Sequence, residues 1–70
     1  MTISNKPTMN PKDMIEYRTS HNWSHKDFAL IIGVTPQAVV LWESGARRVP
    51  ETVVRLIKMF KRRPELVGEF

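Results

Sequence analysis

The residues best suited to chemistry in this sequence are basic, and they are gathered in one stretch. Residues 44–63 hold seven basic residues and one acidic residue, a net charge of +6, whereas residues 1–43 are neutral. The seven are Arg47, Arg48, Arg55, Lys58, Lys61, Arg62 and Arg63. Such a segment can neutralise phosphates, which favours a polyanionic partner such as nucleic acid. On charge alone, a solvated basic helix face is the alternative interpretation.

Other kinds of site have little support. The sequence has no cysteine, which excludes disulfides, thiolate metal sites and cysteine nucleophiles. Neither His21 nor His25 has further ligands at metal spacing, and no paired carboxylates, nucleophile–base arrangement or phosphate loop stands out. We therefore expect no enzyme, no cofactor and no metal. No apolar run suits a membrane span and no secretory segment follows Met1, so we expect a cytoplasmic protein.

The first part of the chain predicts an arm followed by a helix. Residues 1–9 show little periodicity and are expected to form a flexible N-terminal arm. Asn10 followed by Pro11 is typical of an N-cap and a first helical position, and it predicts a helix over residues 11–20. Asn22 can supply a left-handed stop after this helix.

The middle of the chain predicts two short helices separated by a tight turn. Ser24 opens the first of them with a pattern like a capping box, and Gly33 ends it. We expect Gly33 to supply a backbone turn that a side chain would obstruct. Thr35 and Pro36 repeat the cap-and-proline signal and predict a helix that runs to about Ser44. Two short helices joined in this way make a helix-turn-helix.

The last part predicts one more amphipathic helix and a short end. Pro50 begins a helix that continues to about Lys61, and Pro64 breaks it. Residues 65–70 can form a final turn. Because no strand alternation is visible, the predicted fold class is all-α, a compact four- to five-helix bundle with a helix-turn-helix.

Four segments in the middle of the chain resemble a known family. They are Trp23–Ala29 (WSHKDFA), Gly33–Val39 (GVTPQAV), Trp42–Gly45 (WESG) and Arg47–Pro50 (RRVP). Together they are similar to the helix-turn-helix of phage repressors and Cro proteins, the Xre-like family, over roughly Met14–Phe60. The resemblance implies a lambda-repressor-like fold in which residues 35–44 enter the major groove and residues 24–32 cross the DNA backbone.

The resemblance also implies which residues read bases. They are Pro36, Gln37, Ala38, Val40 and Leu41. Gln37 is favoured most, because its amide can donate to and accept from adenine. Val40 and Leu41 are apolar where the family is often polar. Each either senses a thymine methyl group or packs at the edge of the core, and exposure is favoured for Val40.

Phosphate contacts are implied for residues on both sides of the groove. They are His25, Thr35, Ser44, Gly45, Arg47 and Arg48. His25 stands where the family usually carries a phosphate-binding glutamine, at a helix N-terminus that already attracts anions. Which loop arginine contacts DNA stays open. Arg18 and Glu43 match family positions that form a partly buried, structural ion pair.

The C-terminal end is expected to cap the core or to contact a second subunit. Its apolar residues are Leu66, Val67 and Phe70, and we favour the subunit contact because a domain of 70 residues buries only about 60% of its unfolded surface. Residues 10–70 are thus predicted to form one DNA-binding domain with a C-terminal dimerisation segment.

These features favour a sequence-specific transcriptional regulator. The predicted protein is a repressor that binds double-stranded DNA at an inverted-repeat operator as a homodimer, and that autoregulates a phage or mobile-element operon, for example as an anti-CRISPR-associated regulator. One alternative is an antitoxin that also represses its operon, although a toxin partner has no support in the sequence. Another is a helical protein-interaction module that does not bind DNA.

Overall fold

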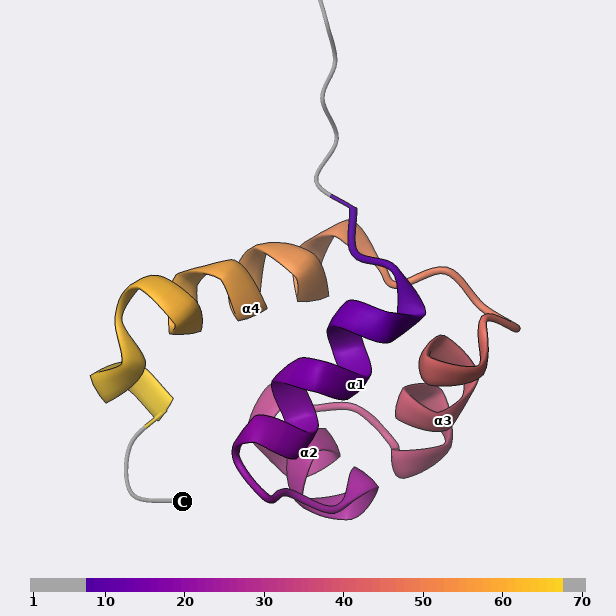
Figure 1. Ribbon diagram of the computed structural model, residues 1–70, viewed down its shortest axis with the longest axis horizontal. Coiled ribbons are helices and arrows are strands. Elements are labelled where there is room, and N and C mark those ends of the chain that lie inside the picture. Colours follow the sequence, from indigo (N-terminus) through magenta and orange to yellow (C-terminus); the bar gives the residue numbers. More distant parts are fainter. Residues whose placement is uncertain (1–7, 68–70) are drawn as a thin grey trace, which may run out of the picture.

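The computed structural model describes residues 8–67 (Figure 1). Within this range the chain forms four α-helices and a short 3₁₀ helix, with no strand. The elements are α1 (Pro11–Ser20), α2 (His25–Ile32), α3 (Pro36–Ser44), α4 (Glu51–Arg62) and η1 (Pro64–Val67). The predicted all-α class with a helix-turn-helix is confirmed. Most of the predicted arm, residues 1–7, and Phe70 lie outside the described residues.

Side-chain caps fix where the first three helices begin. Asn10, Ser24 and Thr35 each accept a hydrogen bond from the backbone N–H three residues later, at 2.8, 3.0 and 3.2 Å. At α2 the carboxylate of Asp27 also accepts from the backbone N–H of Ser24, which completes the predicted capping box. The N-cap of α4, Pro50, has no capping side chain.

Three residues with positive φ mark where α1, α2 and α3 end. Asn22 has φ 59°, Gly33 has φ 78° and Gly45 has φ 84°. Gly33 makes the predicted backbone turn, but the obstacle to a side chain there is not steric, because a Cβ would meet no atom within 4 Å. The glycine is needed because the left-handed backbone conformation is strained for residues with a side chain.

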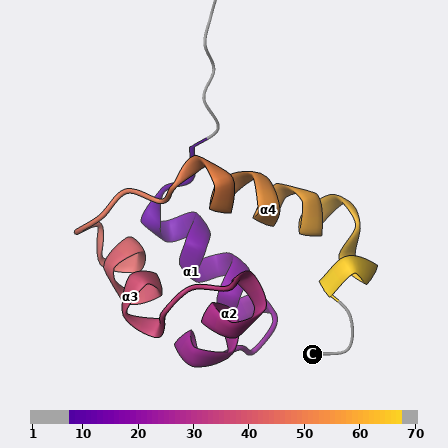
Figure 2. The same cartoon turned by 180° about the vertical axis from the view of Figure 1, so that it is seen from behind.

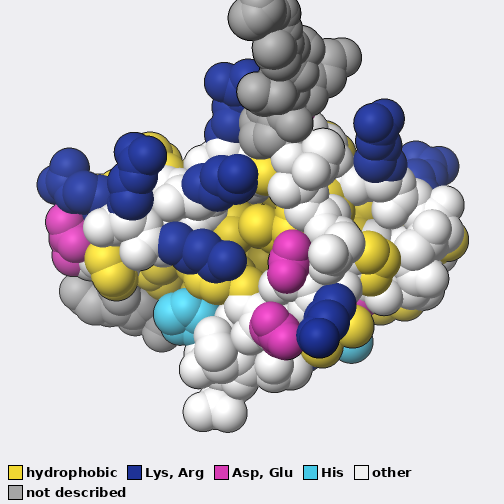
Figure 3. Space-filling view, turned by 45° about the horizontal axis from the view of Figure 1, so that its top comes forward, with side chains coloured by type: hydrophobic (Ala, Val, Ile, Leu, Met, Phe, Trp, Pro, Cys, Tyr) yellow, Lys and Arg dark blue, Asp and Glu magenta, His cyan; other side chains and the backbone are white. Residues whose placement is uncertain are grey.

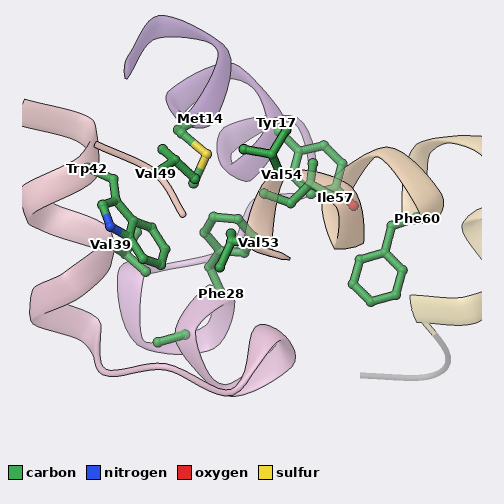
Figure 4. Packing of buried hydrophobic residues seen from close by; sticks show 11 residues of the cluster. Met14, Tyr17, Phe28, Val39, Trp42, Val49, Val53, Val54, Ile57 and Phe60 are labelled. Carbon is green, nitrogen blue, oxygen red and sulfur yellow. The ribbon is translucent and has the colours of Figure 1, made fainter. Parts of the chain in front are cut away.

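The core lies where α4 crosses the unit made by the first three helices (Figures 1 and 2). Its fully buried side chains come from all four helices and are Met14, Phe28, Val39, Val54 and Ile57 (Figure 4). Ala29, on α2, is also 1% exposed. α3 is thereby held at one end of the molecule, and the C-terminal end of α4 with η1 lies at the other (Figures 1 and 2). No helix among the described residues is long and apolar enough to cross a membrane.

Candidate nucleic-acid interface

The first turn of α3 and its N-cap are exposed to solvent. Thr35, Pro36 and Gln37 are exposed, whereas Ala38 is half-buried and packs against the core. The Thr35 hydroxyl accepts from the backbone N–H of Ala38, so its own hydrogen can still be donated outward. The amide of Gln37 makes no hydrogen bond to the described residues, so both its donor and its acceptor face solvent.

One turn later, α3 presents apolar side chains. Val40 is 45% exposed. Leu41 is half-buried, yet it is not among the partly buried side chains that pack on the core cluster. Val39 and Trp42, which are 0% and 5% exposed, hold the opposite face of the helix in the core. The face that carries Gln37 and Leu41 is therefore the outer face of the helix.

An ion pair ties α3 to α1. The guanidinium of Arg18 donates from Nε to Oε2 of Glu43 at 2.7 Å and from Nη2 to Oε1 at 3.0 Å. Its Nη1 donates to the backbone carbonyl of Trp23 at 2.9 Å. The two charged side chains are only 14% and 8% exposed. This bidentate geometry fixes the orientation of the end of α3 relative to α1.

His25 joins this ion pair, a contact that the sequence analysis missed. Its Nε2 lies 3.1 Å from Oε1 of Glu43, and its side chain is 42% exposed. The first residue of α2 therefore sits beside the end of α3. His25 still lies at the N-terminus of α2, the position expected for a phosphate contact. No local pattern in the sequence indicates this contact, because it joins residues 18 apart where α2 and α3 cross.

The electrostatics of the cluster depend on the carboxylate of Glu43. Burial raises its pKa, but the hydrogen bonds from Arg18 and His25 outweigh burial and hold the pKa below the ordinary value of 4.5. The hydrogen bond to Glu43 likewise raises the pKa of the Arg18 guanidinium. The three side chains form one hydrogen-bonded network that spans α1, α2 and α3.

The loop after α3 carries two outward arginines on a folded backbone. Arg47 and Arg48 are exposed, and their side chains have no partner among the described residues. Val49, 8% exposed, anchors the loop in the core. The N–H of Gly45 donates to the carbonyl of Trp42 at 3.2 Å. The expected phosphate contact through the Gly45 amide thus falls on a donor that is already engaged.

Ser44 is also engaged within the protein. Its hydroxyl donates to the carbonyl of Leu41 at 3.1 Å and accepts from the N–H of Ala46 at 3.3 Å. A phosphate contact by Ser44 would require its hydroxyl hydrogen to leave the Leu41 carbonyl. Of the residues expected at phosphate, the two arginines and Thr35 have donors that point outward without such an exchange.

The basic residues of α4 have a different setting. Lys and Arg side chains spread over the face where α4 lies, around apolar surface (Figure 3). Arg55 lies 3.5 Å from Glu51, and the Nζ of Lys61 lies 5.7 Å from the centroid of the Tyr17 ring. The end of α4 is at the opposite end of the molecule from α3 (Figures 1 and 2). The charges of its last turn, Lys61 and Arg62, are therefore separate from the candidate interface.

The residues expected at a subunit contact have unequal exposure. Leu66 is 46% exposed, whereas Val67 is half-buried and packs against the core cluster. Val67 thus contributes to the core, the first of the two roles considered for it. Leu66 is the described residue of this group that a second subunit could reach.

Comparison with models of known protein families gives a match. Residues 14–66 match the model of a family described as helix-turn-helix. The matched stretch runs from α1 to η1 and includes both the ion pair and the basic loop. No curated protein matches the chain. Among the described residues, no group of His, Asp or Glu side chains is arranged to hold a metal ion.

Proposed function

The chain belongs to the helix-turn-helix family of Xre and lambda-repressor type, a family of DNA-binding transcription regulators, and we propose that it is a repressor that binds an inverted-repeat operator as a homodimer. The observation that carries the proposal is the exposed first turn of α3. Thr35 and Gln37 point outward there, on a helix whose other face is fixed in the core by Val39 and Trp42. A rigid helix with an outward first turn is the element that such proteins insert into the major groove.

Groups suited to bind phosphate lie on both sides of the first turn of α3 and support this placement. Thr35 and His25 lie at the N-termini of α3 and α2, where backbone N–H groups and the helix dipole attract anions. Arg47 and Arg48 follow the C-terminal end of α3 and have exposed cationic heads. We propose that the two arginines and Thr35 supply most of the phosphate contacts, and that His25 adds one through Nδ1, since its Nε2 faces Glu43. Ser44 and Gly45 are assigned lesser contacts because their donors are engaged within the protein.

A homodimer would complete the operator contact. Two recognition helices related by a twofold axis meet successive major grooves about 34 Å apart. We propose Leu66 and Phe70 for the subunit contact, supported by the exposure of Leu66. Occupancy of a promoter would repress by excluding polymerase. The resemblance to small phage repressors supports autoregulation of a phage or mobile-element operon, which predicts an inverted repeat upstream of its own gene.

The Gln37→Ala variant tests the placement of α3. If Gln37 reads a base, the variant loses about 1–3 kcal/mol of binding free energy on the operator and hardly changes its binding to random duplex. The measurement is fluorescence anisotropy on both duplexes at one fixed salt concentration. Arg48→Ala is the matched control, and it should weaken binding to both duplexes alike. Equal losses on both duplexes for Gln37→Ala would remove Gln37 from the base-reading role.

A further inference from the structure

We propose that α3 reads A·T base pairs and that it does so through thymine methyl groups. The reading surface is the outer face of α3, formed by Pro36, Gln37, Val40 and Leu41. In this assignment Gln37 meets adenine, while Val40 and Leu41 meet the C5-methyl groups of thymine. The inference rests on the proposed function, because it specifies the DNA sequence class that the same site recognises.

The first observation behind this proposal is that α3 has no free charged side chain. Between Pro36 and Ser44 the only ionisable side chain is Glu43. It is 8% exposed and is held by Arg18 and His25, so it cannot accept from the amino group of cytosine. The helix has no Arg or Lys, the side chains that bond the O6 and N7 acceptors of guanine. α3 therefore lacks the side chains that recognise G·C pairs most strongly.

The second observation is that apolar side chains lie on the outer face of α3. Residues four apart in a helix lie on one face, so Val40 and Leu41 follow Pro36 and Gln37 directly along the outer face. Val40 is 45% exposed, and Leu41 does not pack on the core cluster. In the major groove the only apolar group on a base edge is the thymine methyl. Among the four unmodified bases, an apolar reading face therefore gains affinity from thymine alone.

Polar groups near the face do not change this assignment. The hydroxyl of Ser44 is bonded to the Leu41 carbonyl, and the hydroxyl of Thr35 caps the helix. Arg47 and Arg48 lie on the loop, at the flank of the groove rather than on the helix. Gln37 is thus the one amide on the face, and its donor and acceptor match the N6 and N7 atoms of adenine.

The test begins with selection of bound duplexes from a random 40-base-pair DNA library. The enriched half-sites should be A·T-rich where α3 docks. Each thymine of the enriched duplex is then replaced by deoxyuridine, which removes only the methyl group and keeps every hydrogen-bonding atom. One or two positions in each half-site should lose affinity about four-fold, the value expected for burying one methyl group (about 0.8 kcal/mol). Thymines outside the half-sites should show no change.

Variants of the reading face complete the test. Val40→Ala alters an exposed residue and should abolish the deoxyuridine effect at one position, and Leu41→Ala should abolish it at the other. Circular dichroism checks that Leu41→Ala is folded. If Leu41→Ala does not fold, Val40→Ala still decides the test, because Val40 is exposed and its truncation should leave the fold intact. Enriched sites that bind tightly but show no deoxyuridine effect would overturn the inference and leave the proposed function standing. A library in which no sequence is enriched would overturn both.

Discussion

At the scale of single residues, Glu43 is where three helices are joined. Its carboxylate accepts from Arg18 of α1 and contacts His25 of α2, while the residue itself belongs to α3. Shielded ion pairs of this kind do more to fix geometry than to add stability over an apolar replacement, but removing one partner is costly. The orientation of α3 is therefore sensitive to this one carboxylate.

The stability of the protein should fall in acid because of Glu43. Since its folded-state pKa is lowered, its contribution is complete above the ordinary pKa of 4.5 and is lost as the pH falls through the folded-state value. Urea denaturation of the wild type should show the free energy of unfolding falling below pH 4.5. For Glu43→Gln, the free energy of unfolding should fall less steeply below pH 4.5. At pH 7 this variant should be about 1–3 kcal/mol less stable than the wild type, since Arg18 loses its charged acceptor.

The matched control for this carboxylate is Glu51. It lies 3.5 Å from Arg55 in an exposed pair, so Glu51→Gln should cost less than about 0.5 kcal/mol at pH 7. If the free energy of unfolding falls with pH equally steeply for the wild type and Glu43→Gln, the Arg18–Glu43 ion pair is not the cause of the acid sensitivity.

At the scale of elements, the turn between α2 and α3 depends on the backbone of Gly33. Its φ of 78° is left-handed, and an added Cβ would meet no neighbouring atom. Gly33→Ala should therefore cost only the backbone strain, about 1–2 kcal/mol. Gly33→Asn should cost less, because asparagine tolerates the left-handed region. Thermal unfolding measures both variants, and an equal loss for the two would point to a steric cause instead.

The same element shows what the sequence could and could not predict. The caps Ser24 and Thr35 and the stop Gly33 act over three or four residues, so the bounds of α2 and α3 followed from local pattern alone. The contact between His25 and Glu43 joins residues 18 apart. It depends on how α2 and α3 cross, and nothing local encodes that crossing. Whether Leu41 packs on the core depends on the same crossing of helices, so the local pattern alone left both alternatives open.

At the scale of the whole molecule, the shape restricts how two copies can meet. The molecule is 40 Å long, and α3 and η1 lie at opposite ends of it (Figures 1 and 2). For recognition helices about 34 Å apart, each must lie about 17 Å from the twofold axis. Contact of two copies end to end through η1 would separate the helices further than this. A dimer through η1 must therefore cross the two copies at an angle.

Leu66 is the residue to test for this dimer. It is 46% exposed on η1, so a charged side chain there should weaken a subunit contact without unfolding the protein. Leu66→Glu should shift the protein from dimer to monomer in sedimentation velocity at micromolar concentration. Met59→Glu, a change at another residue with 44% exposure, is the control for a general effect of charge. An unchanged dimer would exclude Leu66 from the contact.

The distribution of positive charge leads to a prediction about salt. Phosphate contacts release counterions, so the logarithm of the binding constant falls with the logarithm of the salt concentration by about 0.9 for each phosphate neutralised.

Arg47 and Arg48 follow the end of α3, whereas Arg62 lies at the far end of α4 (Figures 1 and 2). Arg47→Ala and Arg48→Ala should each reduce the slope by about one on specific and random duplex alike. Arg62→Ala removes the same charge and should leave the slope nearly unchanged, because net charge alone contributes little at that distance in salt. Anisotropy titrations between 50 and 200 mM salt, the range over which such slopes are measured, would give all three slopes. An equal reduction by Arg62→Ala would place the end of α4 on the DNA and require a different docking geometry.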